Sequence, residues 1–386
     1  MVVKNNSAAT LATHFADLDD PRVVGRSDHK LIDILVIGIC TVICGGNDYP
    51  SMETFGKAKE KWLRTFLELP AGIPSSDTFW RVFGAIDPEQ FQTCFLNWMN
   101  RVSQVSDGEI IALDGKQLRR SFDSEDNKAA IHMVSAWATS NRLVLGQRKV
   151  DEKSNEIAAI PELLRRLDIA GCIITVDAMG CQTEIADLIV DQEADYLFAL
   201  KGNQGQLHED VALLFKDLEE SDYTAYDHDY AKTVDNDHGR IEVRHCWTIC
   251  DPQIIANLRN TDRFTNLQTV VRVRSERYMG PDYEEHSVED RFFIGSATTQ
   301  AADALHTART HWQIENELHW VLDISFREDD SRIRKGNGQQ NFAILRHIAL
   351  NALKQEKTAK VGVQNKRLKA GWDNDYLLKV LSLLGV

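Results

Sequence analysis

Between Gly108 and Lys201, apolar and amphipathic stretches alternate in an order that few folds can accommodate. Three short runs rich in β-branched and apolar residues come first, "EIIALDG", "IHMVSAWA" and "RLVLGQRKV", and polar turns separate them. A helix, a strand, a second helix and a fifth strand are then expected in "IPELLRRLDIA", "CIITVD", "GCQTEIADLIVDQEA" and "DYLFALKG". Three successive strands followed by this alternation predict an α/β protein with a mixed five-stranded sheet and helices packed on it.

Two of the expected strands each deliver an aspartate at the C-terminal end. Asp114 follows "IIAL" and Asp177 follows "IITV". Because ligands of open α/β sheets bind beyond the carboxyl ends of the strands, the two side chains are expected to meet there. Each aspartate also has a simpler interpretation: Asp177 could cap the helix that begins near Gly180, and an aspartate before Gly115 is common in turns.

Two converging carboxylates repel each other unless a cation lies between them. Mg²⁺ suits this place, because one or two carboxylates bind it together with waters and phosphate oxygens. Two such ions, ~3.5–4 Å apart, support phosphoryl transfer, and that scheme needs a third acid from a later helix. In "HTARTHWQIENELHWVLDISFREDD", Glu315 and Glu317 flank the apolar face of an expected helix on opposite sides, and periodicity does not choose between them.

The rest of the chain extends this core. Residues 1–100 predict an N-terminal helical domain, with capping residues at the starts of "SSDTFWRVF" and "DPEQF". The core occupies residues 101–205 and resumes at 296–355 with the glutamate helix. Residues 206–295 are acidic at first and then alternate like strands, as in "GRIEVRHCWTIC", so they predict an inserted β-rich domain. Residues 356–386 are expected to form a basic C-terminal tail.

The net charge of −14 argues against a wholly basic nucleic-acid binder. The balance is uneven, however, because the residues from Arg327 onward include 12 Lys or Arg and 6 Asp or Glu, a net of +6, which leaves −20 for the rest of the chain. This basic part is compatible with phosphate contacts on one face, and equally with a solvated helical surface.

Cysteine usage and hydropathy indicate a cytoplasmic protein. The seven cysteines are scattered and form no CxxC pair, so they are expected to be reduced thiols. The longest apolar run, Leu31–Cys44, carries Asp33 and is shorter than the ~20 residues of a membrane helix. We therefore expect a buried helix there and no contact with a membrane.

Several stretches carry a resemblance to a known family: "ALDGKQLRRS", "HMVSAWA", "DEKSNEIAAIPELL", "TVDAMGCQ", "ALKGNQ", "HGRIEVR", "HWQIENELHWVLDISFREDDSR" and "LRHIALNALK". In this order they resemble the H-repeat-associated family of DDE insertion-sequence transposases. The similarity extends from the N-terminal helical region to about Lys354. It implies an RNase H-like core, which the order of elements also indicates, with an inserted β domain. It further implies an enzyme that cuts and joins DNA.

The resemblance implies a catalytic and metal-binding triad of Asp114, Asp177 and Glu315, with two Mg²⁺ ions, for which Mn²⁺ can substitute. Related transposases often carry a Tyr, Arg, Glu and Lys signature around this glutamate. In this sequence His311 stands where the arginine would be, and Leu322 stands where the lysine would be. His311 itself and, as replacements, Arg327, Arg332 and Lys335 are therefore candidates for the phosphate contacts of that signature.

Other residues are weaker candidates for contacts with DNA. Lys116 and Lys201 lie at strand ends, where they could reach a phosphate or simply be surface lysines. His238 and Arg240, in "DHGRIEVR", could contact DNA from the insertion or belong to a turn and a strand surface. His311, Glu315 and His319 recur every four residues like a zinc stripe, but there is no HExxH motif and the two aspartates would stay unexplained.

The expected function is that of an active transposase. Water would cut the strand at a transposon end, and the freed 3′-hydroxyl would attack target DNA. Its partners would be the terminal repeats of the element and the target DNA, with a homodimer when two ends are synapsed, in the cytoplasm at the nucleoid. Two alternatives stay open: a catalytically silent DNA-binding relic, and a stand-alone nuclease with the same metal chemistry, which strand joining with a pre-cut end would distinguish.

Overall fold

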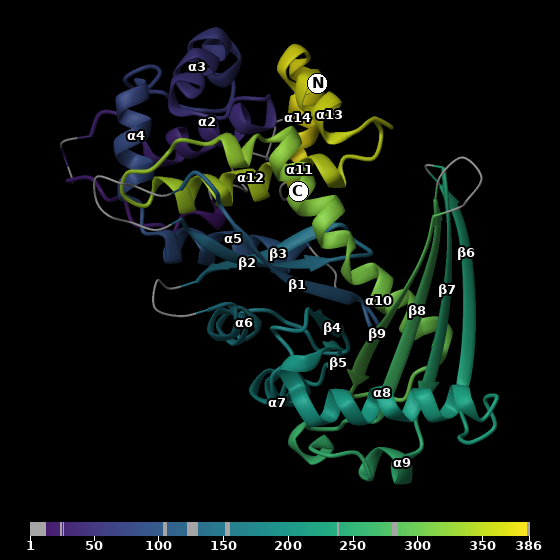
Figure 1. Cartoon of the computed structure of the whole chain (residues 1–386). Coiled ribbons are helices and arrows are strands. Elements are labelled where there is room, and N and C mark those ends of the chain that lie inside the picture. Colours follow the sequence, from purple (N-terminus) through teal and green to yellow (C-terminus); the bar gives the residue numbers. More distant parts are fainter. Residues whose placement is uncertain are drawn as a thin grey trace.

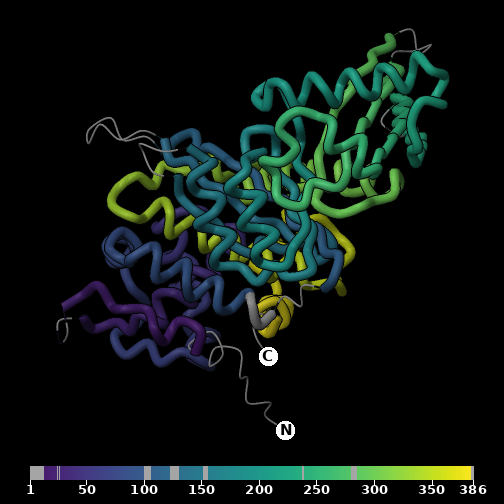
Figure 2. Tube along the Cα trace, turned by 90° about the horizontal axis from the view of Figure 1, so that it is seen from below, coloured from purple at the N-terminus to yellow at the C-terminus, as the bar shows by residue number. Residues whose placement is uncertain are grey.

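One mixed sheet of nine strands runs through the protein, in the order β3-β2-β1-β4-β5-β9-β8-β7-β6 (Figure 1). The N-terminal helices and the last four strands of the sheet lie at opposite ends of the molecule (Figure 2). This computed structural model describes residues 13–23, 25, 27–102, 106–121, 130–150, 155–237, 239–279 and 285–383.

The five strands predicted from the sequence form the first part of the sheet: β1 (Ile110–Gln117), β2 (His132–Ala138), β3 (Leu143–Lys149), β4 (Ile173–Val176) and β5 (Asp195–Leu200). β1 pairs antiparallel with β2, and β2 with β3, whereas β1, β4 and β5 are parallel. The parallel strands are connected by α6 (Glu156–Leu164) and α7 (Thr183–Asp191). The mixed sheet expected from the sequence is therefore confirmed.

The predicted β-rich insertion continues this sheet. Its strands, β6 (Asp229–Asp237), β7 (Arg240–Ile249), β8 (Thr269–Met279) and β9 (Glu285–Gly295), are antiparallel, and β9 pairs with β5. Helices α8 (Gly205–Glu220) and α10 (Ala301–His311) cover its two faces. Alternate side chains of β8 serve the two faces, because Val271 and Val273 pack under α10 while Arg272 donates to the carbonyl of Phe215 in α8. The short α9 (Pro252–Ala256) connects β7 and β8.

The predicted N-terminal helices are α2 (Leu31–Ile43), α3 (Tyr49–Leu63), α4 (Ser76–Ala85) and α5 (Pro88–Val102). Eleven of the 13 residues of α2 are buried, which explains its long apolar run. The side chains of Asp48 and Ser75 cap α3 and α4 by accepting from the amides of Ser51 and Thr78. Pro88 occupies the first turn of α5, where a missing amide hydrogen costs nothing.

The C-terminal part of the chain returns to these helices. After α10 come a π-helix, η3 (Ile314–His319), then α11 (Trp320–Ser325), a short turn η4 (Glu328–Asp330) and α12 (Gly338–Gln355). Fifteen of the 18 residues of α12 are buried, and the helix packs against α2, α4, α5 and β3. The N-terminal helices consequently share one hydrophobic core with the C-terminal part.

The segment expected as a basic tail contains two packed helices, α13 (Val363–Trp372) and α14 (Asn374–Ser382). Arg367 is 1% exposed, and its guanidinium donates to the carbonyl of Val42 (2.8 Å) and lies over the ring of Phe326. The ammonium of Lys366 donates to the carbonyl of Leu353 (2.8 Å). Because these charges are buried and satisfied, the sequence count of +6 overstates the basic surface of this region.

Among the described helices, none combines the length and the apolar character needed to span a bilayer.

Candidate active site

The register of β1 and β4 brings the two aspartates together. The last parallel pair is Leu113 opposite Val176, so Asp114 and Asp177 occupy the next position on adjacent strands. β1 does not end there, since Asp114 and the residues up to Gln117 still pair with β2. The expectation that both aspartates end their strands therefore needs a correction for Asp114: the parallel pairing ends there, and the strand continues.

One oxygen of each aspartate is bound by backbone amides. Asp114 Oδ1 accepts from the amide of Gly115 (2.9 Å), and Asp177 Oδ1 accepts from the amides of Met179 (3.0 Å) and Gly180 (3.1 Å). The simpler roles considered for these residues are not realised: α7 begins at Thr183 with Gln182 as its N-cap, so Asp177 closes a turn before the helix, and Asp114 lies within β1. The amide hydrogen bonds fix each carboxylate in place through Oδ1 and leave Oδ2 for another partner.

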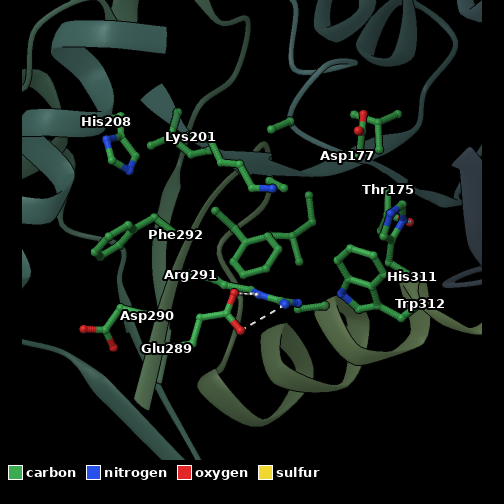
Figure 3. Close-up of a pocket in the computed structure, with 17 residues that line it drawn as sticks. Thr175, Asp177, Lys201, His208, Glu289, Asp290, Arg291, Phe292, His311 and Trp312 are labelled. Atoms are coloured by element: carbon green, nitrogen blue, oxygen red, sulfur yellow. Dashed lines mark hydrogen bonds and ion pairs between the residues drawn. The ribbon is translucent and has the colours of Figure 1, made fainter. Parts of the chain in front are cut away.

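The loop after β5 supports the turn that carries Asp177. Asn203 donates to the carbonyl of Ala178 (2.6 Å), and Gln204 donates to the carbonyl of Cys181 (2.6 Å). Lys201 lines the same cavity as Asp177 (Figure 3). The stretch "KGNQ" thus buttresses the Asp177 turn and places a cation beside it.

Glu315 and Glu317, which helical periodicity could not tell apart, have different surroundings in the structure. The carboxylate of Glu317 pairs with Lys354 in α12 (3.1 Å) and with Arg142 (3.3 Å). Glu315 lines a groove between η3 and the strands of the insertion, and its charge acts on Asp114. Of the two glutamates, Glu315 is therefore the one whose charge reaches Asp114. π-helical turns of this kind occur frequently at functional sites.

Within the described residues, no Lys or Arg forms an ion pair with Asp114, Asp177 or Glu315, although Lys201 lines the same cavity as Asp177. Burial raises the pKa of Asp114 to about 7, against the hydrogen bond from Gly115, and the negative charges of Asp177, Glu156 and Glu315 add to the increase. All four side chains offer oxygen ligands, which Mg²⁺ prefers, and their repulsion is what a divalent cation would relieve. The residues thus fit a metal ion, although within the described ranges no three acids, histidines or cysteines are close enough to hold one as they stand.

Glu156 is a member of this cluster that the sequence analysis missed. It lies in the first turn of α6, and its carboxylate packs over Gly115, where an added Cβ would lie 2.1 Å from Glu156 Oε1. His132 Nδ1 lies 3.3 Å from the same oxygen. Burial raises the pKa of Glu156, as does the charge of Asp177. The only sequence signal was its place in "DEKSNEI", because no spacing rule connects it with Asp114.

Lys116 does not face a substrate. Its side chain is 12% exposed, and its ammonium pairs with Asp323 and with Glu328 (2.9 Å). Glu328 is buried and also pairs with Arg346 (3.4 Å). Lys116 thus ties β1 to α11 and η4, and its ion pairs leave it unsuited to a contact with DNA.

The two histidines of the His311, Glu315, His319 stripe, for which a zinc site was considered and disfavoured, contact different strands. His311 is 7% exposed, and its Nδ1 shares a hydrogen bond with Thr175 Oγ1 of β4 (3.0 Å). The Nδ1 atom of His319 lies 3.5 Å from Asp114 Oδ2. Burial lowers the pKa of both rings to about 4. A shared zinc ion does not fit this geometry, and His311 is too buried for the phosphate contact considered for it.

The basic candidates of the C-terminal segment lie elsewhere. Arg327 and Arg332 line a cavity together with Tyr49 and its neighbours at the start of α3, and none of the four acids lines it. Arg327 is exposed and pairs with Asp330 (3.1 Å). Lys335 follows in the same segment before α12. His238 lies outside the described residues.

A set of arginines that the sequence analysis largely missed leads to Glu315. The arginine groove, between β7, β8, β9 and α10, ends at Glu315 and is lined by Arg240, Arg244, Arg277, Arg291 and Arg309. Among the described residues, the ion-pair partners of these arginines are the carboxylates of Asp235, Glu242 and Glu289. Counting Glu315 as well, five guanidiniums face four acids, which leaves the groove an excess of one positive charge among the described residues. The signal was the alternation in "RIEVR", which places Arg240 and Arg244 on one strand face.

Arg291 and Trp312 connect this groove with the cavity beside Asp177. The guanidinium of Arg291 lies over the ring of Trp312, 5.0 Å from its centre, and both residues line both spaces. Figure 3 shows them on one side of the cavity, with Asp177 and Lys201 on the other. The arginine groove, which contains Glu315, and the cavity beside Asp177 therefore adjoin at Arg291 and Trp312.

The comparisons with known proteins agree with this geometry. The family described as "Transposase DDE domain" matches residues 103–352, and the family described as "DDE_Tnp_1-associated" matches residues 12–99. Two proteins of Escherichia coli strain K12 named "H repeat-associated putative transposase" are similar: YhhI is 40% identical over 97% of this chain and 98% of its own length, and YbfD is 43% identical over 62% and 94%.

Among solved structures, a piggyBac transposase synaptic complex with hairpin DNA aligns with 99% of this chain and 79% of its own, at 10% identity and a TM-score of 0.43. The sequence matches cover nearly the whole chain, and they include every stretch that carries the acids. The chain belongs to the DDE transposase family, among its H repeat-associated members.

Proposed function

We propose that this protein is an insertion-sequence transposase that cleaves DNA strands and transfers them, with Asp114, Asp177 and Glu315 as the catalytic acids of an RNase H-like core. The observation that carries the proposal is the parallel register of β1 and β4, which sets the two aspartates side by side, with Glu315 close enough to repel Asp114. The strand order β3-β2-β1-β4-β5 supports the RNase H-like assignment.

The three acids would hold two Mg²⁺ ions, with Glu156 as a further acid beside them. Bound there, the ions supply activation of the attacking oxygen and stabilisation of the leaving one. The amides that bind Oδ1 of each aspartate keep the carboxylates oriented before metal and DNA arrive. Water would attack the phosphorus, the bond to the 3′-oxygen would break, and that oxygen would take up a proton. The freed 3′-hydroxyl would then lose its proton and attack a target phosphodiester, whose own bond to a 3′-oxygen breaks and releases a target 3′-hydroxyl. No covalent intermediate with the protein forms, so positioning supplies much of the rate.

The arginine groove is the proposed route of the DNA backbone to the acids. Arg240 is 51% exposed, and its guanidinium lies 3.7 Å from Glu242, so most of its donors are free for phosphate oxygens. Lys201 is placed for a phosphate next to Asp177. Because the whole chain carries −14, binding should depend on this localised positive surface and weaken steeply with salt. Terminal repeats, target DNA and a homodimer at synapsis are the partners that this function requires.

The test is cleavage of labelled DNA that carries the terminal repeat of the element and its flank. Wild type and Asp177→Asn are compared with Mg²⁺ and with EDTA. We expect nicking at the repeat boundary with Mg²⁺, none with EDTA, and a loss of at least roughly a thousandfold in the variant. Binding without cleavage by wild type would overturn the proposal and favour a DNA-binding relic. Cleavage without joining of a pre-cut end would favour a nuclease.

A further inference from the structure

Two buried histidines flank Glu315, four residues to either side. His311 ends α10 and His319 ends η3. His311 Nδ1 and Thr175 Oγ1 share a hydrogen bond of 3.0 Å, and Thr175 lies on β4 two residues before Asp177. His319 Nδ1 lies 3.5 Å from Asp114 Oδ2. One histidine therefore contacts each of the strands that carry the aspartates, and Figure 3 shows His311 beside Thr175 and near Asp177.

The segment between the two histidines contains a π-helix, whose orientation on the sheet has to be fixed by contacts of its side chains. A π-helix closes its hydrogen bonds over five residues rather than four, so it rotates side chains away from the faces that α10 and α11 would give them. Ile314 and Leu318 are fully buried, and Glu317 is held by Lys354 and Arg142. Among the described residues, His319 at the end of η3 and His311, three residues before its start, provide polar contacts with β1 and β4. Its remaining acid, Glu315, has no ion pair among the described residues.

We propose that His311 and His319 are positioning residues that lock η3 onto β4 and β1 and so hold Glu315 opposite the two aspartates. The inference rests on the proposed function for the role of Glu315. Outer partners of metal ligands typically change metal affinity or activity by about 10–100-fold when they are removed. In this proposal Glu315 is the acid that acts at the site, and His311 and His319 fix the position of the helical segment that carries it. The two histidines do not bind a metal ion together.

The first experiment needs neither metal nor DNA. Amide hydrogen exchange is measured over residues 308–322 in the full chain for His311→Leu, His319→Leu and Thr175→Val. Thr175→Val removes the partner of His311 while keeping its shape. The control is His306→Leu, the same change at an exposed position of α10. We expect exchange in η3 to be at least about tenfold faster in the three variants and unchanged in the control. Equal exchange in all four proteins would overturn the proposal.

The second experiment measures Mn²⁺ affinity from the Mn²⁺-dependent rise in melting temperature. His319→Asn keeps a nitrogen where Nδ1 stands, so it should bind within about threefold of wild type, whereas His319→Leu should bind roughly 10–100-fold more weakly. Equal losses in the two variants would contradict a positioning role and indicate packing of the ring or direct ligation. If wild type and Asp177→Asn respond alike to Mn²⁺, the proposed metal site fails, and hydrogen exchange still decides whether the histidines fix η3.

Discussion

Asp114, which is half-buried on β1, and Glu328, which is buried beside β1, are carboxylates whose neighbouring charges differ in sign. Glu328 pairs with Lys116 and Arg346, and although burial alone would raise its pKa, these positive charges lower it to about 2. Asp114 is surrounded by other acids, and its pKa rises to about 7. Charges that are balanced within the chain build the fold, whereas charges left unbalanced indicate where something from outside binds.

The largest effect on stability is expected at Glu328, whose charge is balanced by Lys116 and Arg346. Replacing Glu328 with Gln leaves Lys116 and Arg346 without their shared partner in the interior, and losing one member of a buried pair costs about 3–5 kcal/mol. The free energy of unfolding in urea should fall by that amount. Glu220→Gln, at an exposed acid of α8, serves as the matched control and should change it by less than about 1 kcal/mol. A loss of under about 1 kcal/mol in the Glu328 variant would contradict the claim that its buried ion pairs stabilise the fold.

Removing the charge of Asp114, which has other acids around it, should raise the free energy of unfolding instead of lowering it. Because the folded-state pKa of Asp114 is raised to about 7, the stability it contributes is fully present below its unfolded value of about 3.9 and is lost as the pH rises through 7. At pH 8 in EDTA, Asp114→Asn should therefore unfold with about 1–3 kcal/mol more free energy than wild type. The gain should shrink at pH 5. Urea titrations at both pH values measure it, and a less stable variant at pH 8 would contradict repulsion at this edge.

The smallest effect concerns the arginine groove. Arg240→Gln should weaken binding of terminal-repeat DNA several-fold and lower the slope of log affinity against log salt by about 1, because one phosphate contact is lost. Fluorescence anisotropy at several salt concentrations measures both quantities. Arg81→Gln, an exposed arginine of α4, is the control and should leave the slope unchanged. An unchanged slope for Arg240→Gln would remove this residue from the DNA path.

The order of the strands and the two aspartates could be predicted from the sequence, because β-branched runs and helical periodicity are patterns among neighbouring residues. The parallel register then followed from the fold. Glu315 could not be separated from Glu317 by such patterns, since the π-helix changes the face that each side chain occupies. The family resemblance made that choice, and the ion pairs of Glu317 explain it physically.

Long-range pairing was beyond the sequence. Lys116 looked like a surface lysine because its partners, Asp323 and Glu328, lie more than 200 residues away along the chain. Glu156 approaches Asp114 only because Gly115 has no side chain to exclude it. The positive charges of α13 appeared available to DNA, but Arg367 and Lys366 are used to satisfy backbone carbonyls. A count of charged residues along a sequence does not say which of them are exposed to solvent and which are buried.

The most direct test of the account compares two glutamates on one helical segment. Single-turnover cleavage of terminal-repeat DNA with Mg²⁺ is measured for Glu315→Gln and Glu317→Gln, which differ by two positions and have the same change in charge. The account predicts a fall of at least roughly a thousandfold for Glu315→Gln and less than about tenfold for Glu317→Gln. Full activity in Glu315→Gln, or the greater loss in Glu317→Gln, would contradict the assignment of the third catalytic acid.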